Sequence, residues 1–265
     1  MATYFEVRIA GEEKTYAAQA AQAALDLLDK LESHLSRFRA DSELARIAQL
    51  APGEKICLSE PAFACLEIAK KMELGTHGAF SATSAALQTQ ASLPRWSLLP
   101  EDLSIYCESG QLQFDLGAIG KGFALGRMAD LLRSWDCPSF LLVAGGSSIL
   151  AGDAPVDAAG WSCGLGDDNA PQRLFLTHAS LSGSGLAVKG SHILDPRTGQ
   201  PALRQNRAWA LTDTAAESDA LSTASMVLSE PELKEVLAQD ESWLVFLEAD
   251  GTVRPVGSRA LPPQA

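Results

Sequence analysis

The chain has 265 residues, and 46% of them are hydrophobic, which is enough for a substantial buried core. Its 33 Asp and Glu against 21 Lys and Arg give a net charge of -12, so the molecule as a whole repels a phosphate backbone. We therefore expect no nucleic-acid partner. A small phosphorylated ligand is still compatible with this charge, because a few local donors and a divalent cation can hold it.

The cysteines are widely spaced, form no CxxC pair and are odd in number: Cys57, Cys65, Cys107, Cys137 and Cys163. This spacing suits neither a zinc site nor a disulfide framework, so we expect reduced, mostly buried thiols. No run of about 18 apolar residues is present, and no membrane span is expected. The chain opens directly on a strand-like segment, which favours a cytoplasmic protein; the alternative is a periplasmic protein whose leader was removed.

The first third of the chain alternates between strand and helix patterns. Residues 4–9 alternate as a strand does, and residues 17–38 carry apolar side chains at helical spacing. A second helix is predicted over residues 59–76. Residues 88–103 contain Pro and Trp without a pattern and are interpreted as a loop, or as a hinge between two α+β halves of one domain over residues 1–265.

The rest of the chain predicts more short strands with fewer helices. A strand over residues 111–116, a glycine-rich turn, a helix to Trp135 and an apolar strand over 140–144 come first. Further segments follow: strands near 161–165, 174–177 and 209–212, a helix near 218–228, and a strand over 243–247. Strands and helices do not alternate strictly, which favours an α+β fold of mixed β-sheets with packed helices. Residues 262–265 are expected to be disordered.

A glycine-rich segment lies between the strand predicted at 111–116 and the next helix. Residues 115–122 read DLGAIGKG, so three glycines and Lys121 precede or open the helix. Backbone N–H groups there can face an anion such as a pyrophosphate. The segment is neither a Walker A loop nor a GxGxxG fingerprint, and a tight structural turn is the alternative.

Two polar residues on the helix predicted near 218–228 have the spacing of a chelating pair. Asp219 and Thr223 lie four positions apart and therefore share one face of a helix. A carboxylate and a hydroxyl can hold Mg²⁺, which prefers oxygen ligands and completes its shell with water and phosphates. The alternative is that Asp219 stabilises the helix N-terminus and Thr223 faces solvent.

Residues 191–199 read SHILDPRTG, which predicts a short strand that ends in a type I turn. His192 precedes this turn and could act as a base or contact a ligand. A structural histidine at a strand end is the alternative.

These motifs, taken in order, resemble those of the ApbE family of FAD:protein FMN transferases from the first residue to about Leu228. The correspondence consists of the following segments: Met1-Ala2-Thr3 with MGT, residues 35–43 with LSxYxxDSE, 78–81 with GAFD, 115–122 with the start of DLGGIAKGYA, 144–146 with NxGG, 182–183 with SG, 192–199 with HIIDPRTG, and 219–224 with DALSTA. The last two are the most specific.

The resemblance implies that the chain binds FAD with Mg²⁺ and transfers FMN to a Thr or Ser hydroxyl of an acceptor flavoprotein, with release of AMP. It implies that Asp219, Thr223 and the carbonyl of Ala118 hold the metal. We expect His192 to be the general base. The remaining matched positions are the implied FAD contacts: Met1, Phe38, Ala79, Phe80, Ser81, Asp115, Lys121 and Ile193.

The sequence also departs from the family pattern. Ser81 stands where the family usually has Asp, which predicts weaker FAD binding unless neighbouring residues have re-formed the pocket. The connection over 88–103 is shorter than usual and could lack part of a substrate-binding wall. These departures keep open a non-catalytic flavin-binding or carrier protein. An FAD pyrophosphatase that yields FMN and AMP is a further alternative.

Overall fold

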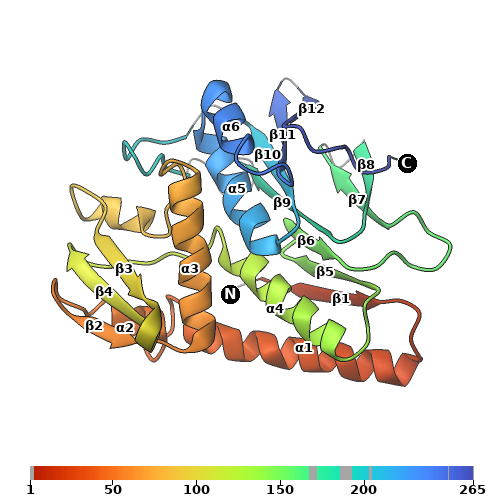
Figure 1. Cartoon of the computed structure of the whole chain (residues 1–265), viewed down its shortest axis with the longest axis horizontal. Coiled ribbons are helices and arrows are strands. Elements are labelled where there is room, and N and C mark those ends of the chain that lie inside the picture. Colours follow the sequence, from red (N-terminus) through yellow and green to blue (C-terminus); the bar gives the residue numbers. More distant parts are fainter. Residues whose placement is uncertain (1–2, 167–171, 186–192, 203–204, 250, 265) are drawn as a thin grey trace.

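The computed structural model describes residues 3–166, 172–185, 193–202, 205–249 and 251–264. Its strands form a seven-stranded sheet, a three-stranded sheet and a two-stranded hairpin, with helices packed between and beside them (Figure 1). The mixed-sheet α+β fold expected from the sequence is confirmed.

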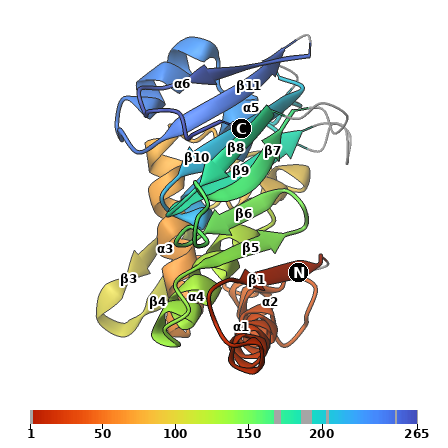
Figure 2. The same cartoon turned by 90° about the vertical axis from the view of Figure 1, so that its right-hand side faces the viewer.

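The seven-stranded sheet is antiparallel throughout and has the order β1-β5-β6-β9-β10-β11-β12. Figure 2 shows these strands one above another. Their bounds are β1 (Phe5–Ile9), β5 (Phe140–Ala144), β6 (Ser148–Ala151), β9 (Ala179–Gly185), β10 (Arg207–Thr212), β11 (Leu244–Ala249) and β12 (Thr252–Val256).

One face of this sheet packs against helices, and the other face packs against the hairpin. Helix α5 contacts the middle strands β6, β9 and β10, and α4 contacts both α5 and α1. The hairpin shares an apolar cluster with β5, β9 and β10. The bounds are α1 (Lys14–Leu35), α4 (Gly120–Ser134), α5 (Ala215–Val227), α6 (Glu230–Leu237), β7 (Trp161–Leu165) and β8 (Gln172–Leu176). Nearly every residue of α5 is buried, so this helix lies at the centre of the fold.

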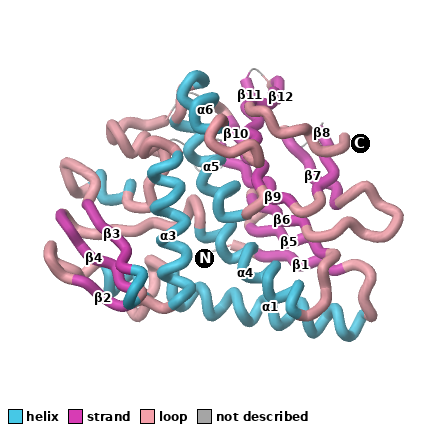
Figure 3. The backbone as a smooth tube through the Cα atoms, viewed as in Figure 1, coloured by secondary structure: helices cyan, strands magenta, loops and turns pink. Residues whose placement is uncertain are grey.

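The three-stranded sheet, of order β2-β4-β3, lies on the other side of α3 from the large sheet (Figure 1). Figure 3 shows the two sheets on opposite sides of a central group of helices. The elements of this part are α2 (Glu43–Ile47), β2 (Lys55–Cys57), α3 (Glu60–Gly75), β3 (Arg95–Leu99), β4 (Ser104–Ser109) and the 3₁₀ turns η1 (Ser84–Gln88) and η2 (Pro100–Asp102).

Two predictions for residues 88–116 were wrong. The loop predicted over 88–103 contains strand β3, which begins one residue after Pro94 and buries Trp96 edge-on against Phe114, with ring centroids 5.0 Å apart. The strand predicted over 111–116 has no ladder partner among the described strands. Its alternate apolar residues are buried as the pattern requires, but the backbone bonds to a loop instead: Asp115 N donates to Ala82 O at 2.7 Å.

The C-terminal tail was also predicted incorrectly for the described residues 262–264. Phe175 N donates to Pro263 O at 2.8 Å, and Leu174 bridges Gln264, so the tail lies along β8. The five cysteines are free thiols, and four of them are buried, as expected. Burial raises the pKa of Cys65 to about 12, which keeps this thiol protonated.

None of the helices in the described part of the chain combines the length and the apolar character that a bilayer crossing requires.

Candidate functional site

The carboxylate of Asp219 is the most heavily bonded buried acid on α5. Its side chain is 4% exposed. Oδ1 accepts from Lys121 Nζ at 2.9 Å and from Ser148 Oγ at 3.0 Å, and Oδ2 accepts from Gly122 N at 3.2 Å. A buried carboxylate is tolerated only with such charge and donors around it. The arrangement therefore holds a negative charge in place at the crossing of α4 and α5.

Gly122 makes this crossing possible. A Cβ at position 122 would lie 1.9 Å from Ala215 O, well inside contact distance. Without a side chain, the first turn of α4 approaches α5 closely enough for its N–H to reach Asp219.

The glycine-rich loop before α4 is ordered by its own residues. Asp115 Oδ1 accepts from Gly117 N at 2.9 Å, and Lys121 Nζ donates to Gly117 O at 3.3 Å. The predicted turn residues Asp115 and Lys121 thus lie at one loop, and Lys121 joins that loop to Asp219. The backbone N–H groups of Gly117, Ile119, Gly120 and Gly122 already donate within the protein, so this helix start offers few free N–H groups to an anion.

Hydroxyl groups from the sheet continue the polar site along α5. Thr223 Oγ1 lies 3.2 Å from Ser184 Oγ and 3.4 Å from the carbonyl oxygen of Asp219. Ser148 and Ser182 are directly opposite on β6 and β9, and Ser184 follows two positions later, so these three hydroxyls share the face that packs on α5. Ser182 Oγ is buried and has no partner among the described residues.

This donor set fits a hard cation. The residues that the resemblance implies as ligands offer a carboxylate (Asp219), a hydroxyl (Thr223) and a backbone carbonyl (Ala118), all of which are oxygen donors suited to Mg²⁺. The orphaned hydroxyl of Ser182 adds another oxygen to the same face. In the described part of the chain no three His, Cys, Asp or Glu side chains gather as a metal cluster.

Arg37 connects Phe38 to the glycine-rich loop. Phe38 is 77% exposed, and the guanidinium of Arg37 lies 4.6 Å from the centroid of its ring. Arg37 also pairs with Asp115 at 3.4 Å. An exposed aromatic ring is suited to stacking on a planar ligand. Arg37 was not singled out from the sequence.

The other predicted FAD contacts differ in accessibility. Ala79, Phe80, Ser81 and Ile193 are all buried, and Phe80 and Ile193 belong to the largest apolar cluster. Their position in the core shows that their side chains also hold the fold together. Met1 and the proposed base His192 lie outside the described residues.

The turn after His192 is anchored to two other motifs. Arg197 bonds both carboxylate oxygens of Asp195 and reaches Glu232 Oε1 on α6 at 2.8 Å. A Cβ on Gly78 would lie 3.5 Å from Arg197 Cγ, so the turn over residues 195–199 lies against the turn that leads to Ser81. The sequence did not indicate this contact.

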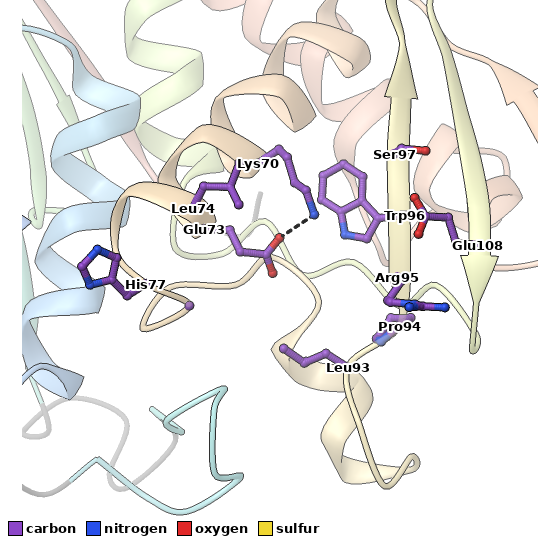
Figure 4. Close-up of a pocket in the computed structure, with 11 residues that line it drawn as sticks. Lys70, Glu73, Leu74, His77, Leu93, Pro94, Arg95, Trp96, Ser97 and Glu108 are labelled. Carbon is purple, nitrogen blue, oxygen red and sulfur yellow. Dashed lines mark hydrogen bonds and ion pairs between the residues drawn. The ribbon is translucent and has the colours of Figure 1, made fainter.

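Ser81 has a charged partner that the sequence analysis missed. Its hydroxyl donates to Glu73 Oε1 at 2.8 Å, lies 3.1 Å from Thr83 Oγ1 and accepts from Thr83 N at 3.2 Å. Glu73 also lines a pocket of about 570 Å³ between α3 and β3 (Figure 4). A carboxylate is therefore present beside Ser81, although it comes from a position eight residues earlier.

With this geometry established, the comparison with known proteins identifies the family. Residues 1–246 match the model of the ApbE family. The chain belongs to the ApbE family.

The relatives of this ApbE-family chain carry the same name, but their sequences are only partly identical to it. Two proteins of Klebsiella pneumoniae (strain 342), each named FAD:protein FMN transferase, are 24% identical to it. One alignment covers 68% of this chain and 66% of the relative, and the other covers 93% and 81%. A mutant of the flavin transferase ApbE from Vibrio cholerae superimposes with a TM-score of 0.83 over 97% of this chain and 94% of that one, at 20% identity. That likeness establishes the ApbE fold.

Proposed function

We propose that this ApbE-family chain is a Mg²⁺-dependent FAD:protein FMN transferase that modifies a Thr or Ser hydroxyl of an acceptor flavoprotein and releases AMP. The observation that carries the proposal is the buried carboxylate of Asp219, held by Lys121 and Gly122 at the end of the glycine-rich loop. Relatives named FAD:protein FMN transferase over most of the chain support the substrate assignment.

In this proposal Asp219, Thr223 and the carbonyl of Ala118 hold Mg²⁺. When bound, the cation neutralises charge on a pyrophosphate and makes its phosphorus accessible to a nucleophile. Lys121 adds a second positive charge at the same place, where it can stabilise the phosphates. Phe38 and Asp115 then lie along the nucleotide, because Arg37 holds the two segments together.

The proposed transfer forms a bond between the acceptor hydroxyl oxygen and the phosphorus of FMN. The bond from that phosphorus to the bridging oxygen breaks, and AMP leaves with that oxygen. The hydroxyl proton passes to a base. His192 is the proposed base, on the support of its motif position and of the ordinary pKa of an imidazole, which allows it to accept a proton near neutral pH.

Chromatography after incubation with FAD and Mg²⁺ tests the proposal. We expect AMP to appear in proportion to FMN bound covalently to an added acceptor flavoprotein. Equal amounts of AMP and free FMN would instead indicate a pyrophosphatase. FAD that binds without any AMP release would indicate a carrier protein and contradict the proposal.

A further inference from the structure

We propose that the pocket between α3 and β3 binds part of FAD and that Glu73 supplies its ligand-binding carboxylate, in place of an acid at position 81. Its carboxylate accepts a hydrogen bond from an N–H or O–H group of FAD. This inference rests on the proposed function, since it names the residue that recognises the same substrate.

The end of α3 brings Glu73 and Ser81 together. Gly78 N donates to the carbonyl oxygen of Glu73 at 2.8 Å, which closes the helix and turns the chain back toward it. His77 takes a positive φ of 51° in this turn. Ser81 consequently returns to the level of Glu73 and points its hydroxyl at the carboxylate.

The bonds of Ser81 fix its role as a donor to Glu73. A hydroxyl has one proton and two acceptor lone pairs. The proton goes to Glu73 Oε1 at 2.8 Å, and Thr83 N donates to the oxygen at 3.2 Å. Ser81 is 6% exposed. It therefore acts as a support for the carboxylate, whereas Glu73 keeps the negative charge.

Glu73 has capacity left for a ligand. A carboxylate offers about four acceptor sites, and among the described residues Glu73 uses two, for Ser81 and for Lys70 Nζ at 3.1 Å. Its side chain is 17% exposed, at the wall of the pocket of about 570 Å³ (Figure 4). The Glu73 carboxylate at that wall can therefore accept a hydrogen bond from a donor group of the ligand.

The surroundings of Lys70 favour a neutral, donor-bearing part of FAD over a phosphate. Lys70 Nζ is held both by Glu73 and by the face of Trp96, 4.6 Å from the ring centroid, so its charge is already compensated. The rest of the wall combines apolar and polar side chains: Leu74, Leu93, Pro94, His77, Arg95, Ser97 and Glu108. Such a pocket accepts a flat ring, and both rings of FAD carry N–H donors, the flavin an imide and the adenine an amine.

Calorimetric titration of FAD in the presence of Mg²⁺ tests this role with four proteins. Glu73→Gln should weaken FAD binding about 10-fold, because a charge-assisted hydrogen bond becomes a neutral one. Ser81→Asp should also weaken binding, because it sets two carboxylates in contact. The double variant Glu73→Ser with Ser81→Asp should return to within about 3-fold of wild type, since the positions exchange roles. Glu67→Gln, an exposed change on the same helix, should leave affinity unchanged.

Separate titrations with FMN and with AMP distinguish the two rings. The fragment whose binding Glu73→Gln weakens is the one in this pocket, and either result supports the proposal. Wild-type affinity of Glu73→Gln for FAD and for both fragments would overturn it. A Glu73→Gln protein in which the KM for the acceptor protein rises while FAD affinity is unchanged would also overturn it. A wild-type protein that fails to bind FAD would contradict the proposed function itself, which is a different outcome.

Discussion

Lys121 and Asp219 lie 98 positions apart in the sequence, yet Lys121 Nζ is 2.9 Å and 3.1 Å from the two oxygens of the Asp219 carboxylate. The lysine side chain is 20% exposed and the aspartate side chain is 4% exposed, so water screens this ion pair only partly. A cation that binds Asp219 must therefore share the carboxylate with Lys121 or move the lysine toward the ligand.

Replacing Lys121 by Met tests whether the lysine competes with Mg²⁺ for the Asp219 carboxylate and whether it helps to bind FAD. With the ammonium removed, Mg²⁺ alone should bind Asp219 about 10-fold more tightly, because a neighbouring positive charge no longer opposes it. FAD should bind more weakly, since one positive charge near its phosphates is lost. Titration calorimetry with Mg²⁺ and then with FAD measures both, with the exposed Lys14→Met as control. An unchanged Mg²⁺ affinity would mean that Lys121 does not compete for Asp219.

His192→Ala should slow FMN transfer by roughly 10²- to 10⁴-fold, the range typical for loss of a general base. Binding of FAD should change little, because the proposed role is proton transfer alone. Single-turnover measurement of AMP release, together with FAD titration, separates these quantities. If FAD affinity falls as steeply as the rate, His192 is a binding residue.

Gly122→Ala should destabilise the protein by about 2–4 kcal/mol, because the added methyl group would force α4 away from α5 at Ala215. Gly126→Ala on the same helix is the matched control, because nothing lies within 4 Å of its Cβ position. That substitution should be neutral or stabilising by up to about 1 kcal/mol. Urea denaturation of both variants measures the difference. Equal stability would show that the helix crossing is not tightly packed.

The lowered pKa of Glu232 predicts that the stability of the protein depends on pH. The hydroxyl and N–H of Ser229 and the guanidinium of Arg197 hold the pKa of Glu232 down to about 2. Because this folded-state pKa lies below the unfolded value of about 4.3, the stabilisation is complete above that value and is lost as the pH falls toward 2. Glu232→Gln should therefore cost about 1 kcal/mol at pH 7. The difference from wild type should disappear at low pH, and denaturation curves that differ equally at every pH would contradict this.

Local patterns predicted much of the fold. The apolar run over residues 140–144 matches β5 residue for residue, and the four predicted helices lie within a few residues of α1, α3, α4 and α5. The short helices α2 and α6 were not predicted. Leu112 and Phe114 are buried in alternation, as in a strand, although the strand assignment itself was wrong. Alternation of apolar and polar residues indicates which side chains are buried. Whether the backbone finds a neighbouring strand to pair with depends on residues far away in the sequence.

The sequence predicted which candidate residues lie near one another where a single segment carries them. Asp219 and Thr223 share one helix, and Asp115 and Lys121 share one loop, so motif spacing was informative. The contact of Lys121 with Asp219 depends on how α4 crosses α5, and only the close approach at Gly122 reveals it. Glu73 was missed because nothing in its local sequence distinguishes it from a surface glutamate. Its pairing with Ser81 depends on the turn that follows α3.

The most direct test of the central claim compares FMN transfer by the wild-type protein and by Asp219→Asn, which keeps the shape of the side chain and removes its charge. With FAD, Mg²⁺ and an acceptor flavoprotein, mass spectrometry of the acceptor measures covalent FMN, and circular dichroism checks the fold. We expect the wild type to flavinylate a Thr or Ser of the acceptor and the folded variant to lose at least about 10²-fold in rate, as for loss of a metal ligand at a phosphoryl-transfer centre. Flavinylation by folded Asp219→Asn at the wild-type rate would contradict the account.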